Sequence, residues 1–174
     1  MARIRLHNED WGFETNCFVC EPRNERGLQI PFFHDTDAAC VIADIELSND
    51  FSGAPNYVHG GVTLAVLDEA QAWACIAIGG KWAVTTETTT RFAAAVKVGQ
   101  PYHVEARIVG AGTDVAVDDT MMRTEAVVLD SRGKVRATSS ATFVVLGAAQ
   151  AVRAGAELAD GAERFMRGGS LPER

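Results

Sequence analysis

One stretch of the chain restricts its fold more than any other. Residues 62–78 form a run that is rich in Ala, Leu and Ile and contains no Pro or Gly, and it is long enough to be an α-helix. The run is apolar nearly all round, and a helix of that kind is expected to be buried rather than to lie on a surface. Asp68 and Glu69 interrupt it, and a carboxylate on a buried helix needs a partner or a chemical role. We therefore predict a central helix that carries a functional acid.

The start of this helix offers a second chemical feature. Gly60 and Gly61 leave the N–H groups of the first turn uncovered by side chains, and a bare helix N-terminus suits a developing negative charge. On a continuous helix Gly60 and Asp68 are about 12 Å apart, and the side chains of His59 and Asp68 leave opposite faces. One reacting atom cannot touch the helix start and the carboxylate of the same chain. If both act on it, the carboxylate comes from a second copy, so the spacing favours a site shared between two subunits.

These residues resemble a known family. The order His59-Gly60-Gly61, then Asp68 within an apolar helix, then several strands, is similar to the hot-dog-fold thioesterases of the phenylacetate-pathway branch, over residues 17–146. The segment that begins Cys17-x-x-Cys20 resembles an N-terminal signature in one branch of the same family. The resemblance implies an α+β hot-dog fold and an acyl-CoA thioesterase, a thioester hydrolase that acts as a homodimer or, by pairing of dimers, a homotetramer.

The resemblance also assigns roles at the helix. Asp68 is expected either to attack the thioester carbonyl as a nucleophile or to activate a water as a general base, and the sequence leaves both open. The N–H of Gly60 is expected to bind the thioester oxygen as charge grows on it. His59 faces away from its own Asp68, so we expect it to shape the loop or cap the helix. Glu69 points about 100° away from Asp68 and is expected to make a structural or interface hydrogen bond, and it is the alternative candidate for the acid.

Further residues are expected to contact the substrate. Thr85 and Thr86 lie where members of the family place a Ser or Thr near the attacking group, although Thr on a strand is also a good β-former. Asn56 precedes the helix, and Asn tolerates the left-handed backbone that a turn requires. The substrate-binding set is therefore Asn56, His59, Gly61, Thr85 and Thr86.

The cysteines bear on the redox compartment and on metal binding. The chain has four cysteines and no evident secretory signal, which favours reduced thiols over a disulfide framework. Cys17-x-x-Cys20 is half of a zinc-binding pattern, with His34 or Cys40 as candidates for further ligands. Because no complete pattern of four ligands is present, we predict no metal and no other cofactor.

Length and charge limit the remaining possibilities. The 174 residues suit one domain, which we divide into an N-terminal arm (1–27), a hot-dog domain (28–146) and a partly helical or disordered tail (147–174). The net charge of −7 argues against nucleic acid as the main partner. The first ten residues lack the apolar run of a signal peptide, and acids interrupt the longest apolar stretch, so we expect a cytoplasmic protein with no membrane contact.

The rest of the sequence predicts an antiparallel sheet wrapped around the helix. Alternating or β-branched stretches predict strands at 28–34, 39–47, 84–96, 102–109, 115–129 and 134–146. Asp130–Gly133 predicts a hairpin turn. Basic residues follow that turn and could meet the phosphates of coenzyme A, although a solvated strand face is the default interpretation.

Two alternative functions stay open at this point. One is an acyl-thioester hydratase or dehydratase of the same fold, in which His59 would take part in proton transfer. The other is a non-catalytic acyl-CoA-binding protein. The sequence does not identify the acyl group.

Overall fold

The computed structural model describes residues 2–11, 15–109, 120–153 and 165–166. Its elements follow one another as β1 (Arg3–Arg5), η1 (Asn8–Trp11), β2 (Phe33–Asp35), β3 (Cys40–Glu46), η2 (Asn49–Phe51), β4 (Ser52–Ala54), β5 (Tyr57–Val58), α1 (Gly60–Ala77), β6 (Ala83–Phe92), β7 (Pro101–Ile108), β8 (Met121–Asp130), β9 (Val135–Val145) and α2 (Ala148–Arg153). Within these described residues, no helix is both long and apolar enough to span a membrane.

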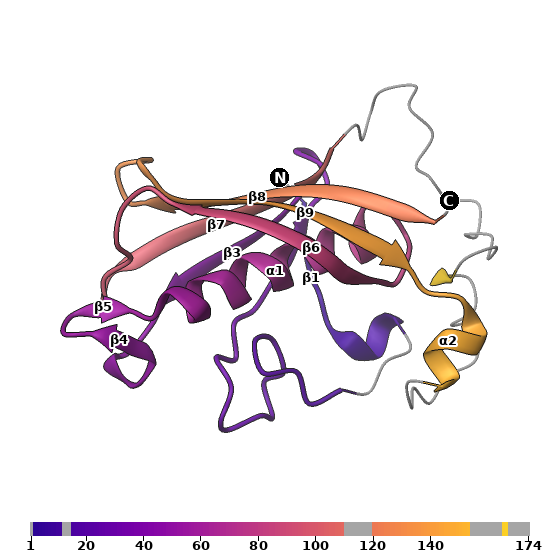
Figure 1. The fold of residues 1–174 in the computed structure, drawn as a ribbon, viewed down its shortest axis with the longest axis horizontal. Helices are drawn as coiled ribbons and strands as arrows, with labels where there is room; N and C mark the ends of the chain where they lie inside the picture. Colours follow the sequence, from indigo (N-terminus) through magenta and orange to yellow (C-terminus); the bar gives the residue numbers. More distant parts are fainter. Residues whose placement is uncertain (1, 12–14, 110–119, 154–164, 167–174) are drawn as a thin grey trace.

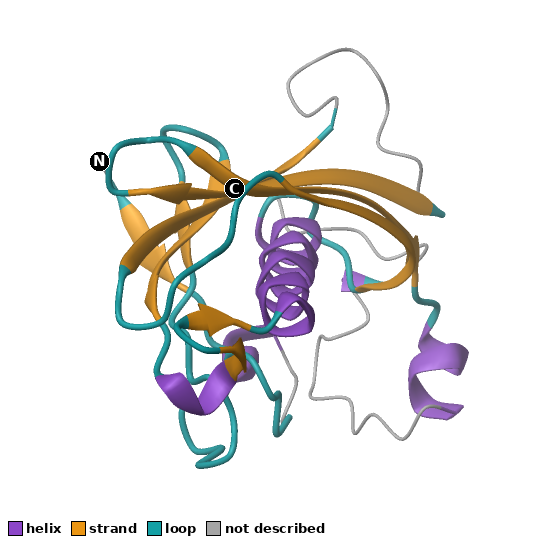
Figure 2. Cartoon of the chain, turned by 60° about the vertical axis from the view of Figure 1, so that its left-hand side comes forward, coloured by secondary structure: helices purple, strands orange, loops and turns teal. Residues whose placement is uncertain are grey.

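The main sheet curves around α1. It has seven strands in the order β1-β2-β3-β7-β8-β9-β6, and every neighbouring pair is antiparallel. Buried and exposed residues alternate along β7 and β8, so one face of the sheet packs on the core and the other meets solvent. Figures 1 and 2 show α1 lying across the concave face. The predicted α+β hot-dog fold is confirmed.

Helix α1 ends at Ala77, just before Gly79 and Gly80. Gly80 adopts a left-handed φ of 66°, and its N–H donates to the carbonyl of Ile76 at 2.9 Å, which closes the last turn. The buried side of α1 that faces the sheet includes Gln71, whose side-chain amide donates to the hydroxyl of Thr124 on β8 at 3.0 Å. One side of α1 is only partly covered and includes Asp68, next to β6. The helix is thus largely buried, as its apolar sequence predicts.

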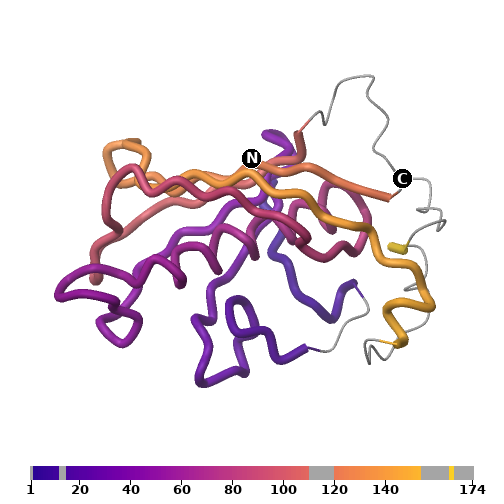
Figure 3. Tube along the Cα trace, viewed as in Figure 1, coloured from indigo at the N-terminus to yellow at the C-terminus, as the bar shows by residue number. Residues whose placement is uncertain are grey.

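Most predicted strands appear close to their predicted bounds. The first one differs, because β2 covers only the end of the predicted stretch 28–34. The N–H groups of Leu28 and Ile30 donate instead to the carbonyls of Phe18 and Val19, at 2.7 and 2.8 Å. The backbone before β2 is thus paired with the Cys-x-x-Cys segment and not with a sheet strand. Figure 3 shows this N-terminal segment crossing under α1, on the side away from β8 and β9.

Some predictions lie partly outside the described residues. They are the first part of the strand predicted at 115–129 and most of the tail from residue 147. Within the predicted N-terminal arm, β1 extends the sheet by pairing with β2. The division into arm, domain and tail stays a prediction.

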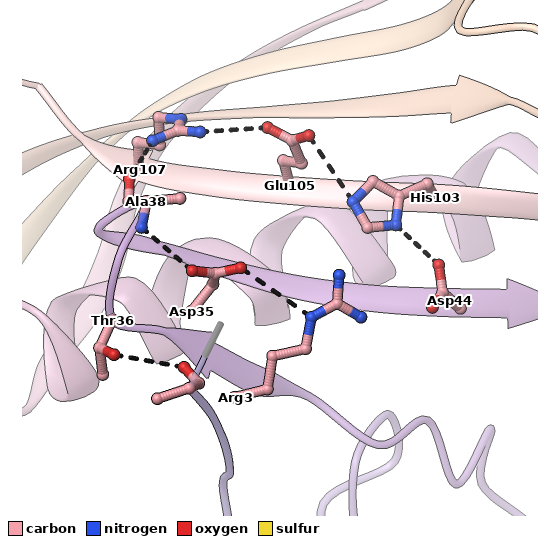
Figure 4. Close-up of polar contacts among 9 residues, drawn as sticks. Arg3, Asp35, Thr36, Ala38, Asp44, His103, Glu105 and Arg107 are labelled. Atoms are coloured by element: carbon pink, nitrogen blue, oxygen red, sulfur yellow. Dashed lines mark hydrogen bonds and ion pairs between the residues drawn. The ribbon is translucent and has the colours of Figure 1, made fainter.

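The outer face of the sheet near β2, β3 and β7 is polar. Figure 4 shows a chain of contacts in which Asp44 meets His103 at 2.7 Å, His103 meets Glu105 at 3.6 Å and Glu105 meets Arg107 at 3.4 Å. These groups are partly or largely exposed, and exposed ion pairs contribute little to stability. These side chains form a polar network on the solvent-exposed face of the sheet, on the side away from α1.

Candidate active site

The N-terminus of α1 is built around His59. His59 is the N-cap, and its Nδ1 accepts a hydrogen bond from the N–H of Gly61 at 2.9 Å. A Cβ on Gly61 would lie 3.0 Å from that nitrogen, and a Cβ on Gly53 would lie 2.8 Å from Cδ2 of the ring. Both glycines therefore let the imidazole sit against the backbone. The predicted capping role of His59 agrees with this geometry.

The N–H of Gly60 is left available by this arrangement. Gly60 is exposed, and within the described part of the chain no acceptor bonds to its N–H. It belongs to the first turn of α1, where N–H groups lack helical partners and the helix dipole favours negative charge. A Cβ at this position would meet only the Phe92 ring, at 3.7 Å. A carbonyl oxygen could therefore reach the amide along a path lined by an aromatic ring.

Asp68 lies two turns further along α1 and is partly exposed. The hydroxyl of Thr85 on β6 donates to its Oδ1 at 2.7 Å. No other described group bonds to this carboxylate, so Oδ2 is free to accept a proton or to attack. The structure thus brings Thr85 to the predicted acid.

The other two residues of the predicted substrate-binding set lie elsewhere. The hydroxyl of Thr86 donates to the carbonyl of Thr142 on β9 at 3.0 Å, so it stabilises the sheet and not Asp68. Asn56 has a left-handed φ of 65° in the turn between β4 and β5, which is the conformation anticipated for it. Its backbone contact is structural, because its carbonyl accepts from Val98 N–H at 3.2 Å.

Gly60 and Asp68 do not meet within one chain. Both belong to one continuous helix, α1, so about 12 Å of helix axis separates them. Asp68 lies beside Thr85 of β6, and among the described strands β6 pairs with β9 alone and forms an edge of the sheet. Val84 and Phe92 on this strand are 47% and 53% exposed. An unpaired edge with exposed apolar side chains is a template for a second chain.

The sequence of this region matches a known family. Residues 55–129 match the family model of the thioesterase superfamily, and the match includes the His59-Gly60-Gly61 turn, Asp68 and Thr85. This stretch belongs to the thioesterase superfamily. No curated protein matches the chain.

Solved structures share the fold of this superfamily segment. A crystallised thioesterase superfamily protein superposes with a TM-score of 0.65 at 24% identity, covering 74% of this chain and 60% of its own. A Streptococcus mutans protein bound to acetyl-CoA gives 0.56 at 20% identity, with 63% of this chain and 82% of its own covered. The E. coli PaaI protein, from the phenylacetic acid degradation operon, gives 0.55 at 16% identity, with 63% and 74% covered. These likenesses establish the fold.

Glu69, the second acid in the superfamily segment, faces the N-terminal segment. Sγ of Cys17 lies within hydrogen-bond distance of its Oε1, at 3.4 Å. Burial, with the charge of Cys17 as the next cause, raises the pKa of Glu69 to about 8. The hydrogen bond from the Cys20 thiol is the main reason that the pKa of Cys17 falls to about 5. Glu69 is therefore engaged with the two cysteines, a contact that the sequence did not reveal because 52 positions separate Cys17 from Glu69.

A basic hollow lies at the turn between β8 and β9. It is lined by Lys97, Arg132, Lys134 and Arg136, together with Tyr102 and neighbouring residues. Arg136 contacts Asp130 at 2.6 Å, so that cation is already paired. Lys97, Arg132 and Lys134 are exposed and could meet an anionic group.

Proposed function

We propose that this protein hydrolyses an acyl-CoA thioester in a groove formed between two copies of the chain. The thioester oxygen accepts a hydrogen bond from the Gly60 N–H of one copy. Asp68 of the other copy drives cleavage, either by attacking the carbonyl carbon or by taking a proton from the attacking water. The products are the free acid and coenzyme A, and no cofactor takes part in these steps.

One observation carries this proposal: an N–H without an acceptor and a carboxylate with one free oxygen belong to the same helix but lie about 12 Å apart. Each has the chemistry that thioester hydrolysis requires, namely a donor for the developing oxyanion and a base or nucleophile. A second copy that pairs along the free edge of β6 would bring its own Asp68 toward the first copy's Gly60, since Asp68 is held beside that edge by Thr85.

Superfamily membership supports the reaction class, and the S. mutans structure with acetyl-CoA supports a CoA-linked substrate. We infer that the exposed cations Lys97, Arg132 and Lys134 bind phosphates of the CoA carrier. The acyl group would lie toward the partly covered side of α1. The cap occupies Nδ1 of His59, and no step proposed here uses its imidazole as an acid or a base.

Gly60 offers an unusually clean test. Gly60→Pro removes the N–H and little else, because proline is favoured at the first position of a helix. His59 already has φ −59° and ψ 134°, a conformation that tolerates a following proline. We expect Gly60→Pro to lower kcat for a panel of acyl-CoA thioesters by about 100-fold or more, as for loss of an oxyanion donor. The release of free thiol measures the rate.

The matched control is Gly60→Ala, which adds a Cβ against Phe92 and retains the amide. It should keep kcat within about tenfold of wild type, whereas Asp68→Asn should lose nearly all activity with the fold unchanged. Near-wild-type cleavage by Asp68→Asn, or equal losses in Gly60→Pro and Gly60→Ala, would refute the assignment.

A further inference from the structure

Three side chains with metal-binding atoms converge beneath α1, outside the site described above. They are Cys17 and Cys20 from the N-terminal segment and Glu69 from the helix. One ligand atom of each, two sulfurs and a carboxylate oxygen, lies within 4.8 Å of the others. All three residues are partly buried. Among the described residues no other His, Cys, Asp or Glu groups gather in this way.

The Cys17-x-x-Cys20 turn points N–H donors at its sulfurs. The N–H groups of Val19 and Cys20 lie 3.3 and 3.4 Å from Sγ of Cys17. The side-chain amide of Asn8 donates to Sγ of Cys20 at 3.4 Å. Such donors stabilise the thiolate form, which is the form that binds metals, and they orient the sulfurs as outer-shell partners do in metal sites.

The turn is also held rigidly in place. The side-chain amide of Asn24 donates to the carbonyl of Cys17 at 3.3 Å. A Cβ on Gly27 would lie 2.5 Å from the carbonyl oxygen of Phe18, so the chain closes tightly behind the turn. The β-like pairing of residues 18–19 with 28–30 fixes the segment further. Two sulfurs on a fixed turn and one carboxylate on a packed helix make a preorganised set of ligands.

The chemistry of the set selects a class of ion. Two thiolates and a carboxylate suit Zn²⁺, which takes Cys sulfur and Asp or Glu oxygen in tetrahedral sites, whereas Mg²⁺ and Ca²⁺ require oxygen ligands throughout. Three protein ligands leave a fourth position for water. A divalent cation would also supply the positive charge that a partly buried carboxylate between two thiols otherwise lacks.

We propose that Cys17, Cys20 and Glu69 bind one zinc ion, which ties the N-terminal segment to α1 directly beside Asp68. This differs from the expectation of no metal, which rested on the absence of a complete ligand pattern in the sequence. The missing ligand is neither His34 nor Cys40, the candidates considered first, but Glu69. The ion would join two segments of the fold, and the proposal does not depend on the thioesterase reaction.

Cobalt substitution in the full-length chain provides the test. The protein is stripped with a chelator under reducing conditions and titrated with Co²⁺, and then with Zn²⁺ as competitor. Wild type should bind one equivalent per chain and show the thiolate-to-cobalt charge-transfer band of a tetrahedral site, which Zn²⁺ abolishes. Cys17→Ser, Cys20→Ser and Glu69→Gln should each weaken binding at least tenfold.

Cys40→Ser is the matched control, because Cys40 is a buried thiol on β3 that lies outside the cluster. It should retain the band and the affinity. Thermal unfolding with and without Zn²⁺ gives a second readout, in which wild type and Cys40→Ser gain stability and Glu69→Gln does not. Absence of the thiolate band in reduced wild type would overturn the proposal. Unchanged affinity in Glu69→Gln would do so as well, since the cysteine pair would then bind without the helix.

Discussion

At the scale of single residues, the structure distinguishes Thr85 from Thr86 as candidates for the active site. Thr85 and Thr86 are adjacent and chemically identical, and the sequence assigned both to the site. The pairing of β6 with β9 shifts register between Thr85 and Glu87, so Thr86 occupies an irregular position in the ladder. Thr85 reaches Asp68 on α1, while the hydroxyl of Thr86 reaches the carbonyl of Thr142. We regard Thr85 as a positioning residue, because it holds one oxygen of Asp68 and leaves the other free.

Removal of the Thr85 hydroxyl should lower catalysis without lowering binding. A hydrogen bond to a charged group contributes about 1.5–3 kcal/mol, so Thr85→Val should reduce kcat by about 10- to 100-fold while KM changes little. Thr85→Ser, which retains the hydroxyl, should recover most of the rate. Thr86→Val serves as control and should behave almost like wild type in steady-state assays with an acyl-CoA. Similar losses of kcat in Thr85→Val and Thr86→Val would show that the Thr85 contact is structural only.

At the scale of elements, the sequence predicted what is periodic and missed what depends on distant partners. The helix predicted at 62–78 appears as α1, Gly60–Ala77, because its apolar run and its flanking glycines are local signals. The short strands β1, β4 and β5 have no local pattern of their own and exist only through their partners. The contact between Glu69 and the cysteines was invisible for the same reason, since it joins segments 52 positions apart.

The β8–β9 hairpin shows that a turn can be read from sequence in detail. Gly133 adopts a left-handed φ of 72°, and Asp130 Oδ1 accepts from the N–H groups of Arg132 and Lys134, both at 2.9 Å. Asp130 Oδ2 meets Arg136 at 2.6 Å. These bonds, with that from Lys134 N–H as the largest cause, lower the pKa of Asp130 below its ordinary value. The hairpin that carries the proposed phosphate-binding cations is thus held by an ionised carboxylate.

Asp130→Asn should therefore destabilise the protein in a pH-dependent way. A carboxyl whose pKa is lowered by folding stabilises the folded state above its unfolded pKa of about 3.9, and this stabilisation disappears as pH falls through the lower folded value. Thermal unfolding at neutral pH should show a lower midpoint for the variant, and the difference from wild type should shrink toward about pH 3. Glu125→Gln, which changes an exposed acid on β8, should show no such dependence. A constant difference across this pH range would contradict the electrostatic explanation.

At the scale of the whole molecule, the active site proposed here is incomplete in one chain, and the incompleteness has a geometric origin. A continuous helix fixes Gly60 and Asp68 on one rigid body about 12 Å apart, so no side-chain movement can bring them together. The spacing alone was enough to predict this from the sequence. The surface that would complete the site could not be predicted, because the free edge of β6 follows from the strand order of the entire sheet.

A mixed oligomer tests the shared site directly. Gly60→Pro and Asp68→Asn chains are expressed together with different tags, and oligomers that contain both are isolated by two successive affinity steps. In a symmetric dimer, one of the two sites then combines the intact Gly60 of one chain with the intact Asp68 of the other, so roughly half of the wild-type activity should return, although each parent is inactive alone. The opposite pairing, wild type with a chain that carries both changes, should be inactive, because each site then lacks one group. If that second oligomer keeps half of the activity and the first has none, the site lies within a single chain and the proposal of a shared site is wrong.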